Sequence, residues 1–474
     1  MKTKHIYYIA ALAMLTACTN NEEFETITSN GMQKVTFADP FVGKNLTRAS
    51  GDITTDGTEG TTSALTSYKI KVWGQEVNKP DDNTELTAIT GKPSTNQTET
   101  PFYGGYEISH SESGWAADKE FYYPRDKYTF RFAAFAPADA IYDESSNPNG
   151  VNLAIKADGS LTFRGADDNS YGITNIPLVQ EISNTDNDKK GWDLLVSNRV
   201  LSKPSNDGVT DRTPISFTFQ HILSKLSFYV YASQTDGKKF YVKSIKAYLP
   251  KDNWTGSYKQ NSGTEKPTAE SKTDVENNST SWSSTYHDTW AWEKKSDKSL
   301  DFENITNIVT PSDFDSKIVE AAKDDATTPN SYKEYVVFTK TSTDDKGDEV
   351  TLTGYNMTPS SGTDKIICKS YFLAPTPAAE GTNGVKNYNF YVKIEYTIAE
   401  TVGDVTTTKA MTGYLDLSKS EFTRFRQGWH HKVYIGLAHK TIRFISATVS
   451  DWDGNHDEDM TVSREVEGWT SEQK

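Results

Sequence analysis

Cysteine is almost absent from this sequence of 474 residues, which contains only Cys18 and Cys368. Two cysteines cannot build a disulfide framework, so the small disulfide-rich scaffolds are excluded. Basic residues are also in deficit, because 50 lysines and arginines stand against 65 acidic residues and leave a net charge of −15. Binding to a phosphate backbone needs clustered Lys and Arg, so the composition excludes nucleic acid as a partner.

Long hydrophobic runs are missing as well. The apolar run from Ile6 to Ala17 is shorter than the about 20 residues that span a bilayer, and it follows Lys2 and Lys4, as in a secretory signal. It ends in Leu-Thr-Ala before Cys18, which resembles a bacterial lipobox, and the acid-rich residues 19–25 resemble the surface-export signal of Bacteroidetes lipoproteins. We therefore expect a lipoprotein signal peptide at 1–17 and a lipid anchor on Cys18 in the cell outer membrane.

Aromatic residues are abundant, with 25 Tyr, 21 Phe and 10 Trp. A disordered chain lacks so many rings, and this length favours two domains. Helical periodicity is scarce, whereas apolar and polar residues alternate in short segments bounded by turn residues, as in half-buried antiparallel strands. These segments are 68–73, 128–132, 215–219, 225–230, 388–396 and 432–437. The pattern predicts an all-β protein built from β-sandwiches.

A short strand is also predicted near the N-terminus, where Val35 and Phe37 alternate with polar neighbours. A loop around Arg48 follows it, and Gly and Thr dominate the sequence from there to Ser63. Such a loop is easily cleaved by proteases, and Arg48 would suit a trypsin-like one.

Several phrases resemble the fimbrillin (Mfa-like) family of Bacteroidetes pilus subunits. They are Phe-Tyr-Tyr-Pro-Arg at 121–125 followed by the strand and Ala-Pro at 128–137, Phe-Gln-His-Ile-Leu-Ser-Lys-Leu at 219–226, and the closing strands at 428–437 and 442–452. The resemblance implies two tandem transthyretin-like antiparallel β-sandwich domains, expected at 49–212 and 213–474. It also implies that an Arg-specific protease cuts after Arg48, so that the mature chain begins at Ala49. The propeptide 18–48 would then leave with its strand.

The second domain is expected to carry a polar insertion at 256–298, in which Trp282, Trp290 and Trp292 are embedded. Two interpretations stay open. The indoles dock on the second domain beneath a long surface loop, or the loop projects and offers exposed Trp side chains to a glycan or a partner.

Motifs that carry chemistry are absent or incomplete. The acidic run 451–459 alternates oxygen-bearing side chains, but His456 and Val462 occupy the places where a calcium loop needs Gly and Glu. His221, His430, His431 and His439 are expected to be structural, and Cys368 to be a buried apolar residue. No hydrolase elbow, phosphate loop, dinucleotide fingerprint or zinc-protease helix occurs. We expect no enzyme, no metal and no cofactor.

The function that these features favour is a structural or adhesive subunit, shaft or tip, of a cell-surface pilus. Its expected partners are other pilus subunits, the Arg-specific protease and a surface receptor or glycan. Strand addition would join the subunits, and the acidic C-terminal tail, with Met460, Val462 and Val466, is a candidate donor strand. The alternative is a surface glycan-binding lipoprotein of a nutrient-uptake system.

Overall fold

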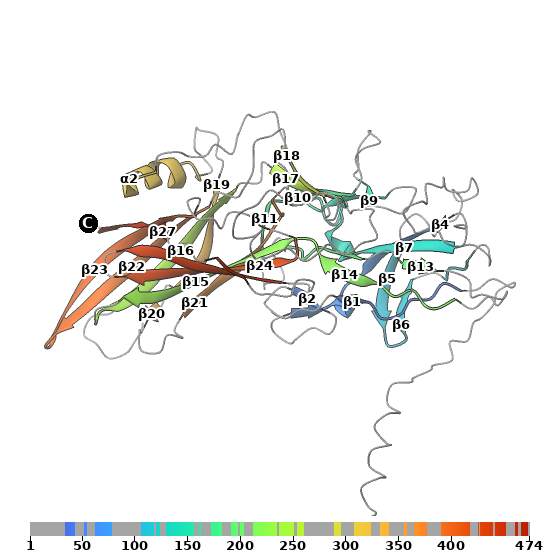
Figure 1. Ribbon diagram of the computed structural model, residues 1–474, viewed down its shortest axis with the longest axis horizontal. Helices are drawn as coiled ribbons and strands as arrows, with labels where there is room; N and C mark the ends of the chain where they lie inside the picture. The colour runs from blue at the N-terminus through green and yellow to red at the C-terminus, as the bar shows by residue number, and fades with distance from the viewer. Residues whose placement is uncertain are drawn as a thin grey trace, which may run out of the picture.

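A computed structural model describes much of the chain in separate stretches. These are residues 34–42, 52–54, 62–77, 106–117, 120–123, 129–155, 161–162, 172–182, 191–197, 200–202, 212–234, 237–250, 254–259, 289–294, 308–323, 332–340, 355–357, 365–376, 390–417, 425, 427–438, 441–451, 460–462 and 466–472. They form an elongated molecule with the first half of the chain at one end and the second half at the other (Figure 1).

Strands dominate the described residues, which confirms the all-β prediction. In the first half they are β1 (Phe41–Val42), β2 (Asp52–Thr54), β3 (Thr62–Ala64), β4 (Ile70–Val77), β5 (Tyr106–Ser111), β6 (Gly114–Ala117), β7 (Thr129–Ala136), β8 (Asn152–Ile155), β9 (Leu161–Thr162), β10 (Gly172–Pro177), β11 (Val179–Glu181), β12 (Leu195–Ser197), β13 (Val200–Ser202) and β14 (Thr218–His221). Short 3-10 helices lie at η1 (Leu65–Ser67) and η5 (Ala138–Ala140).

The second half continues the pattern with longer strands. They are β15 (Ser224–Gln234), β16 (Lys239–Pro250), β17 (Trp254–Lys259), β18 (Thr289–Lys294), β19 (Tyr332–Thr339), β20 (Tyr355–Met357), β21 (Lys365–Leu373), β22 (Tyr391–Val402), β23 (Val405–Asp416), β24 (Trp429–Ala438), β25 (Ile442–Asp451), β26 (Met460–Val462), β27 (Val466–Glu467) and β28 (Trp469–Glu472). Helix α2 (Pro311–Phe314) runs on into the π-helical turn η6 (Asp315–Val319).

Two sheets organise the first half. An eight-stranded sheet has the order β1-β14-β12-β7-β4-β5-β6, with β13 also paired to β7, and a five-stranded sheet has the order β18-β17-β10-β8-β9. Successive side chains of β7 point to opposite faces, so Phe132 and Phe135 belong to two different apolar clusters. The eight-stranded sheet is therefore buried on both faces where β4 and β7 run through it.

Two further sheets organise the second half. A seven-stranded sheet runs β11-β21-β15-β24-β25-β26, with β27 also on β25, and a six-stranded sheet runs β19-β16-β22-β23-β28, with β20 also on β16. The hairpin of β22 and β23 pairs without interruption up to Val402 and Val405. Its turn is Gly403-Asp404, where Gly403 takes a φ of 63° that favours glycine.

Strands cross between the halves. β17 pairs with β10 in the five-stranded sheet and β18 pairs with β17, and both strands lie in or beside the expected polar insertion. β11 pairs with β21 in the seven-stranded sheet. β14, which follows residue 213, pairs with β12 and β1 of the first half. The expected division at 212/213 stays a prediction, but the two halves share strands and one large apolar cluster.

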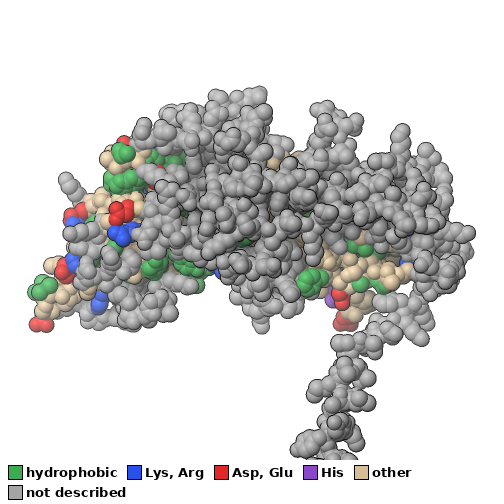
Figure 2. All heavy atoms as spheres, viewed as in Figure 1, with side chains coloured by type: hydrophobic (Ala, Val, Ile, Leu, Met, Phe, Trp, Pro, Cys, Tyr) green, Lys and Arg blue, Asp and Glu red, His purple; other side chains and the backbone are tan. Residues whose placement is uncertain are grey.

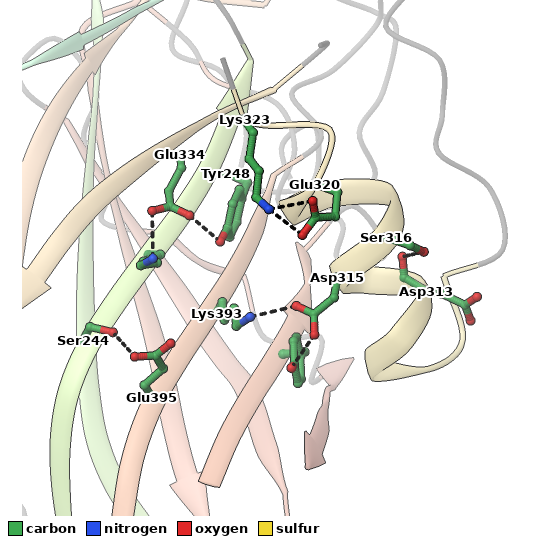
Figure 3. Close-up of polar contacts among 12 residues, drawn as sticks. Ser244, Tyr248, Asp313, Asp315, Ser316, Glu320, Lys323, Glu334, Lys393 and Glu395 are labelled. Atoms are coloured by element: carbon green, nitrogen blue, oxygen red, sulfur yellow. Dashed lines mark hydrogen bonds and ion pairs between the residues drawn. The ribbon is translucent and has the colours of Figure 1, made fainter. Parts of the chain in front are cut away.

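Helix α2 covers an aromatic patch on the six-stranded sheet. The helix begins with a capping box of Thr310 and Asp313, and Phe314 lies edge-on to Tyr391 and Tyr414. Figure 3 shows Asp315 reaching the sheet, where it accepts from Lys393 at 2.7 Å and from the Tyr414 hydroxyl at 2.9 Å. Burial raises the pKa of Tyr414 to about 12, so this phenol keeps its proton and donates a hydrogen bond to the Asp315 carboxylate.

Candidate functional site: the groove filled by residues 34–42

The candidate site is a groove in the first half that holds residues 34–42. On one side, the Val35 N–H donates to the Phe121 carbonyl at 2.8 Å. On the other, the Ile215 N–H donates to the Thr36 carbonyl at 2.8 Å, and the Ala38 N–H donates to the Ile215 carbonyl at 2.9 Å. The segment is antiparallel to Tyr122 and parallel to Ile215. It is therefore paired along both edges at its start and, as β1, continues beside β14 (Figure 1).

Apolar side chains of this segment fill the core of the first half. Val35 is 5 % exposed and Val42 is 3 % exposed, and both belong to the cluster that includes Phe217 and Phe219. The Phe37 ring stacks on Phe217 with centroids 6.3 Å apart. The buried positions predicted from sequence thus lie against the core, and Val42 is a buried position that the sequence analysis did not single out.

The parallel pairing contains one irregularity. Phe37 lies opposite Ile215, but Phe41 lies opposite Thr218, so four steps along the segment match three along its neighbour. The Phe217 carbonyl accepts from the Phe41 N–H at 2.8 Å. In a regular ladder that carbonyl would face residue 40, which is Pro40 and has no N–H to donate. The bulge therefore brings the next donor onto the carbonyl.

Polar contacts between three neighbouring parts of the fold support one wall of the groove. The Arg212 guanidinium, buried in the fold, lies 4.2 Å from the centre of the Tyr123 ring and donates to the Ser202 carbonyl at 2.9 Å. The Tyr123 hydroxyl lies 2.9 Å from Ser202 Oγ. Burial raises the pKa of Tyr123, so the phenol stays neutral at physiological pH. These contacts tie residues 123, 202 and 212 together beneath the strand.

An exposed charged pair lies at the start of the segment. The Lys34 ammonium lies 2.8 Å from the Glu120 carboxylate, and the Tyr122 hydroxyl donates to the same carboxylate at 2.8 Å. The hydrogen bond from Lys34 is the main cause that lowers the pKa of Glu120. Exposed ion pairs contribute little stability, so the apolar side chains and the backbone bonds hold the segment.

The C-terminal tail is folded onto its own half. Met460 and Val462, the candidate donor residues, lie in β26 and pair with β25, and Val466 lies in β27 on the same strand. β28 then crosses to the other sheet and pairs with Met411–Tyr414 of β23. In this structure the tail occupies sheet edges within the chain, and its role as a donor stays a prediction.

One of the three tryptophans of the expected polar insertion is buried. Trp290 is 5 % exposed, its ring lies 5.3 Å from that of Tyr258, and its indole N–H donates to Gln427 at 3.2 Å. Of the two interpretations left open, the exposed one does not hold for Trp290, because β18 pairs with β17 and carries this side chain into the core. The backbone of Trp292 pairs with Gly256 in the same ladder, and Trp282 lies outside the described residues.

A second concave surface lies at the end of the second half, between β22, β23 and β28. It has a volume of about 660 Å³ and is lined by acidic and basic side chains in pairs, such as Lys238 with Glu400 at 3.1 Å and Lys409 with Glu472 at 2.7 Å. In Figure 2, red and blue side chains likewise alternate on the described part of this end. The surface offers neither a catalytic cluster nor a field of one sign.

The titratable groups singled out by sequence are buried wherever the structure describes them. His221 Nδ1 lies 2.8 Å from the Asp193 carboxylate, both buried, and His430 Nε2 lies 2.9 Å from Ser227 Oγ. His431 lies edge-on to Phe425. Cys368 is buried, and burial raises the pKa of its thiol, so it is not a ready nucleophile. Within the described stretches, no group of three His, Cys, Asp or Glu residues could hold a metal ion.

Several predicted positions lie outside the described residues. They are Cys18, Arg48, Ala49, His439 and the acidic run from Trp452 to Asp459. Lipidation and cleavage therefore stay predictions from sequence. Among the helices that the structure does describe, none is long and apolar enough to cross a membrane.

Comparisons with known proteins give structural neighbours only. No family model matches the chain, and no curated protein matches it in sequence. Similar solved structures include a fimbrial protein from Bacteroides vulgatus (15 % identity, 89 % of this chain and 99 % of that chain, TM-score 0.41) and a fimbrial protein from Bacteroides ovatus (11 %, 85 % and 48 %, 0.27). A tip fimbrial protein from Porphyromonas gingivalis, truncated at its C-terminus, is also similar (9 %, 81 % and 94 %, 0.29). Because these scores are low, we base the function on the residues of this chain.

Proposed function

We propose that this chain is the precursor of a structural or adhesive subunit of a cell-surface pilus. It is exported as a lipoprotein, anchored to the outer membrane through Cys18, and assembled by strand addition after cleavage behind Arg48. The observation that carries the proposal is the way residues 34–42 fill the groove. They form backbone hydrogen bonds on both sides and bury Val35 and Val42 in the core. A strand from a neighbouring subunit would occupy the same groove.

Cleavage would convert a tethered strand into a separate one. In the precursor, the covalent connection through Arg48 keeps the strand near its groove. The strand therefore rebinds at an effective concentration in the millimolar range. After cleavage only its own affinity keeps it in place, and a competing strand can replace it. The vacated groove would expose Ile215, Phe217 and Phe219, each at most 1 % exposed while the strand is bound. An open apolar edge of this kind favours association with another strand.

Digestion with an Arg-specific protease tests this function. The purified precursor should yield a ladder of oligomers on a gel without boiling, and N-terminal sequencing of the ladder should read Ala49. The Arg48→Ala variant should stay monomeric under the same digestion. If that variant polymerises as well as the parent, cleavage behind residue 48 does not trigger assembly and the proposal is wrong.

The donor role of the tail needs a separate test. A chain that ends at Asp459 lacks β26, β27 and β28, which now cover edges of both sheets in the second half. If the tail donates a strand to the next subunit, this variant should accept a strand after cleavage but should stop the growth of the ladder. Normal ladders from the shortened chain would show that the tail does not donate.

A further inference from the structure

The C-terminal strand β28 lies at the edge of the six-stranded sheet, where it pairs with Met411–Tyr414 of β23. Its 4 residues are joined to this sheet along one side, and short edge segments of this kind open readily. Trp469 lies opposite Tyr414 in the ladder, so Trp469, Ser471 and Tyr414 point to the same face. Helix α2 lies against β28 on that face. The helix therefore adds contacts that the ladder alone does not give to the tail.

The apolar part of this contact is an aromatic cluster beneath the helix. The Phe314 ring is fully buried and lies edge-on to the Tyr414 ring, with centroids 5.1 Å apart. Trp469 of β28 and Val319 of η6 are partly buried and pack against the same cluster. Because an indole buries a large apolar area, Trp469 anchors β28 to the surface that the helix covers.

The polar part is a chain of hydrogen bonds from the tail to the helix. The Ser471 side chain is hydrogen-bonded to the Tyr414 hydroxyl. That hydroxyl donates to Asp315 at 2.9 Å, and Asp315 also accepts from the Lys393 ammonium at 2.7 Å. Figure 3 shows Asp315 on the side of the helix that faces the sheet, opposite Lys393. A carboxylate accepts stronger hydrogen bonds than a neutral group, so Asp315 fixes the hydroxyl to which β28 is bonded.

The helix has supports of its own that do not include the tail. The Phe314 ring also lies edge-on to Tyr248 of β16 at 6.0 Å and to Tyr391 of β22 at 5.8 Å. The ion pair of Asp315 with Lys393 joins the helix to β22 as well. Both strands lie inside the sheet, between β19 and β23. The dependence is therefore one-sided, because the tail rests on the helix while the helix rests on inner strands.

We propose that α2 and η6 form a latch that holds β28 on β23, and that Asp315 is the positioning residue of this latch. Loss of the Asp315 contact releases the Tyr414 hydroxyl from the helix, and Ser471 then bonds to a group that is no longer fixed. The tail leaves the sheet more often, while the helix stays on the inner strands. The inference rests on the proposed function only in what release achieves, since a freed tail serves assembly if the tail is the donor strand.

Hydrogen–deuterium exchange of the uncut precursor tests the latch. In Asp315→Ala, the backbone amides of residues 469–472 should exchange roughly 10-fold faster than in the parent, because a hydrogen bond to a charged group is lost. Alanine preserves the helix, since it is the best helix former. Glu320→Ala, in the same helical segment, removes one exposed ion pair with Lys323 and should change this exchange by less than about twofold. The amides of β15, inside the seven-stranded sheet, report global opening and serve as the reference.

The variant Trp469→Ala separates a latch from mutual packing. It removes the anchor of the tail, so residues 469–472 should again exchange faster. The amides of Glu320 and Ala322, which are bonded within the helical segment, should stay within about twofold of their rates in the parent. Equal acceleration of both segments would show that helix and tail stabilise each other, and the inference would be wrong. An unchanged exchange of β28 in Asp315→Ala would overturn it as well.

Assembly of the cut protein separates the inference from its premise. The protein is cut behind Arg48 and freed from residues 34–42, so that release of the tail limits the growth of the ladder. If the tail is the donor strand, Asp315→Ala should then build ladders roughly 10-fold faster than the parent, in step with its faster exchange. Faster exchange of β28 with ladders that grow at the rate of the parent would confirm the latch and contradict the donor role of the tail.

Discussion

The two ends of the described chain are both strands, but they are held in opposite ways. Residues 34–42 lie between two segments of the first half, with Val35 and Val42 in its core. The C-terminal strands β26, β27 and β28 lie on the edges of the second half. The contrast shows that the end expected to be removed by a protease is the more deeply packed one. Its removal would leave a hole in a core, whereas the loss of the tail would uncover sheet edges and the partly buried contact of Trp469.

A charge on the buried face of β1 gives the largest expected effect, and a charge on its exposed face is the matched control. Val42→Asp would put a carboxylate beside Phe219 with no partner, and we expect it to lower the free energy of unfolding by roughly 3–5 kcal/mol. Phe41→Asp, one residue away and on the exposed face, should cost under about 1 kcal/mol. Urea unfolding of the uncut precursor measures both. Equal losses of unfolding free energy in the two variants would show that Val42 does not point into the core and Phe41 away from it.

A crowded glycine tests the tail. A Cβ on Gly468 would lie 2.1 Å from the Tyr414 carbonyl oxygen, a backbone atom that cannot swing away. Gly468→Ala should therefore lift β28 off β23 and cost about 1–3 kcal/mol, less than the change at Val42. Glu467→Ala, next to it, removes one exposed ion pair with Arg443 and should cost under about 1 kcal/mol. A loss at Gly468 as large as that at Val42 would abolish the contrast between the two ends.

Acid should act on the second half through His430. Burial, with help from the nearby Lys225, Lys432 and His431 charges, holds the pKa of His430 well below its usual 6.5. The unfolded chain therefore binds this proton first, and the stability is full above pH 6.5 and falls as the pH drops below it. At pH 5.5 the loss relative to pH 7.5 should be roughly 1 kcal/mol.

The variant His430→Gln isolates that contribution. It keeps a polar group near Ser227 but cannot be protonated, so its urea midpoint should fall less between pH 7.5 and 5.5 than that of the parent. The same fall in both proteins would show that His430 is not the group responsible. The effect is the smallest of the three, because it comes from one proton rather than from lost packing.

Much of the fold follows from the sequence because alternation is a local signal. The pattern at 225–230 is the middle of β15, and that at 432–437 lies within β24. The inward positions Val35 and Phe37 follow from the same rule. The pairing of β17 with β10, and of β18 with β17, could not be predicted, since the polar sequence between β17 and β18 gives no sign that Trp290 enters a core shared by both halves.

The bulge between Phe37 and Phe41 does not follow from the alternation of the sequence. Alternation from Val35 and Phe37 predicts that Phe41 points inward, and Pro40 reads as the end of a strand. In the structure Phe41 is exposed and Pro40 is buried, because the missing N–H of Pro40 lets the ladder skip one residue at the Phe217 carbonyl. Pro40 is visible in the sequence, but its effect on the pairing depends on the Phe217 carbonyl, which is far away in the sequence.

Hydrogen–deuterium exchange at residues 215–219 tests the central claim, that residues 34–42 fill a groove which another strand can take. The Ile215 N–H, bonded to Thr36 in the structure, should be protected in the precursor. It should exchange rapidly in the cut monomer freed from residues 34–42 and should be protected again in the assembled polymer. Equal protection in the precursor and in the freed monomer would contradict the account, because the strand would then not be what covers this edge.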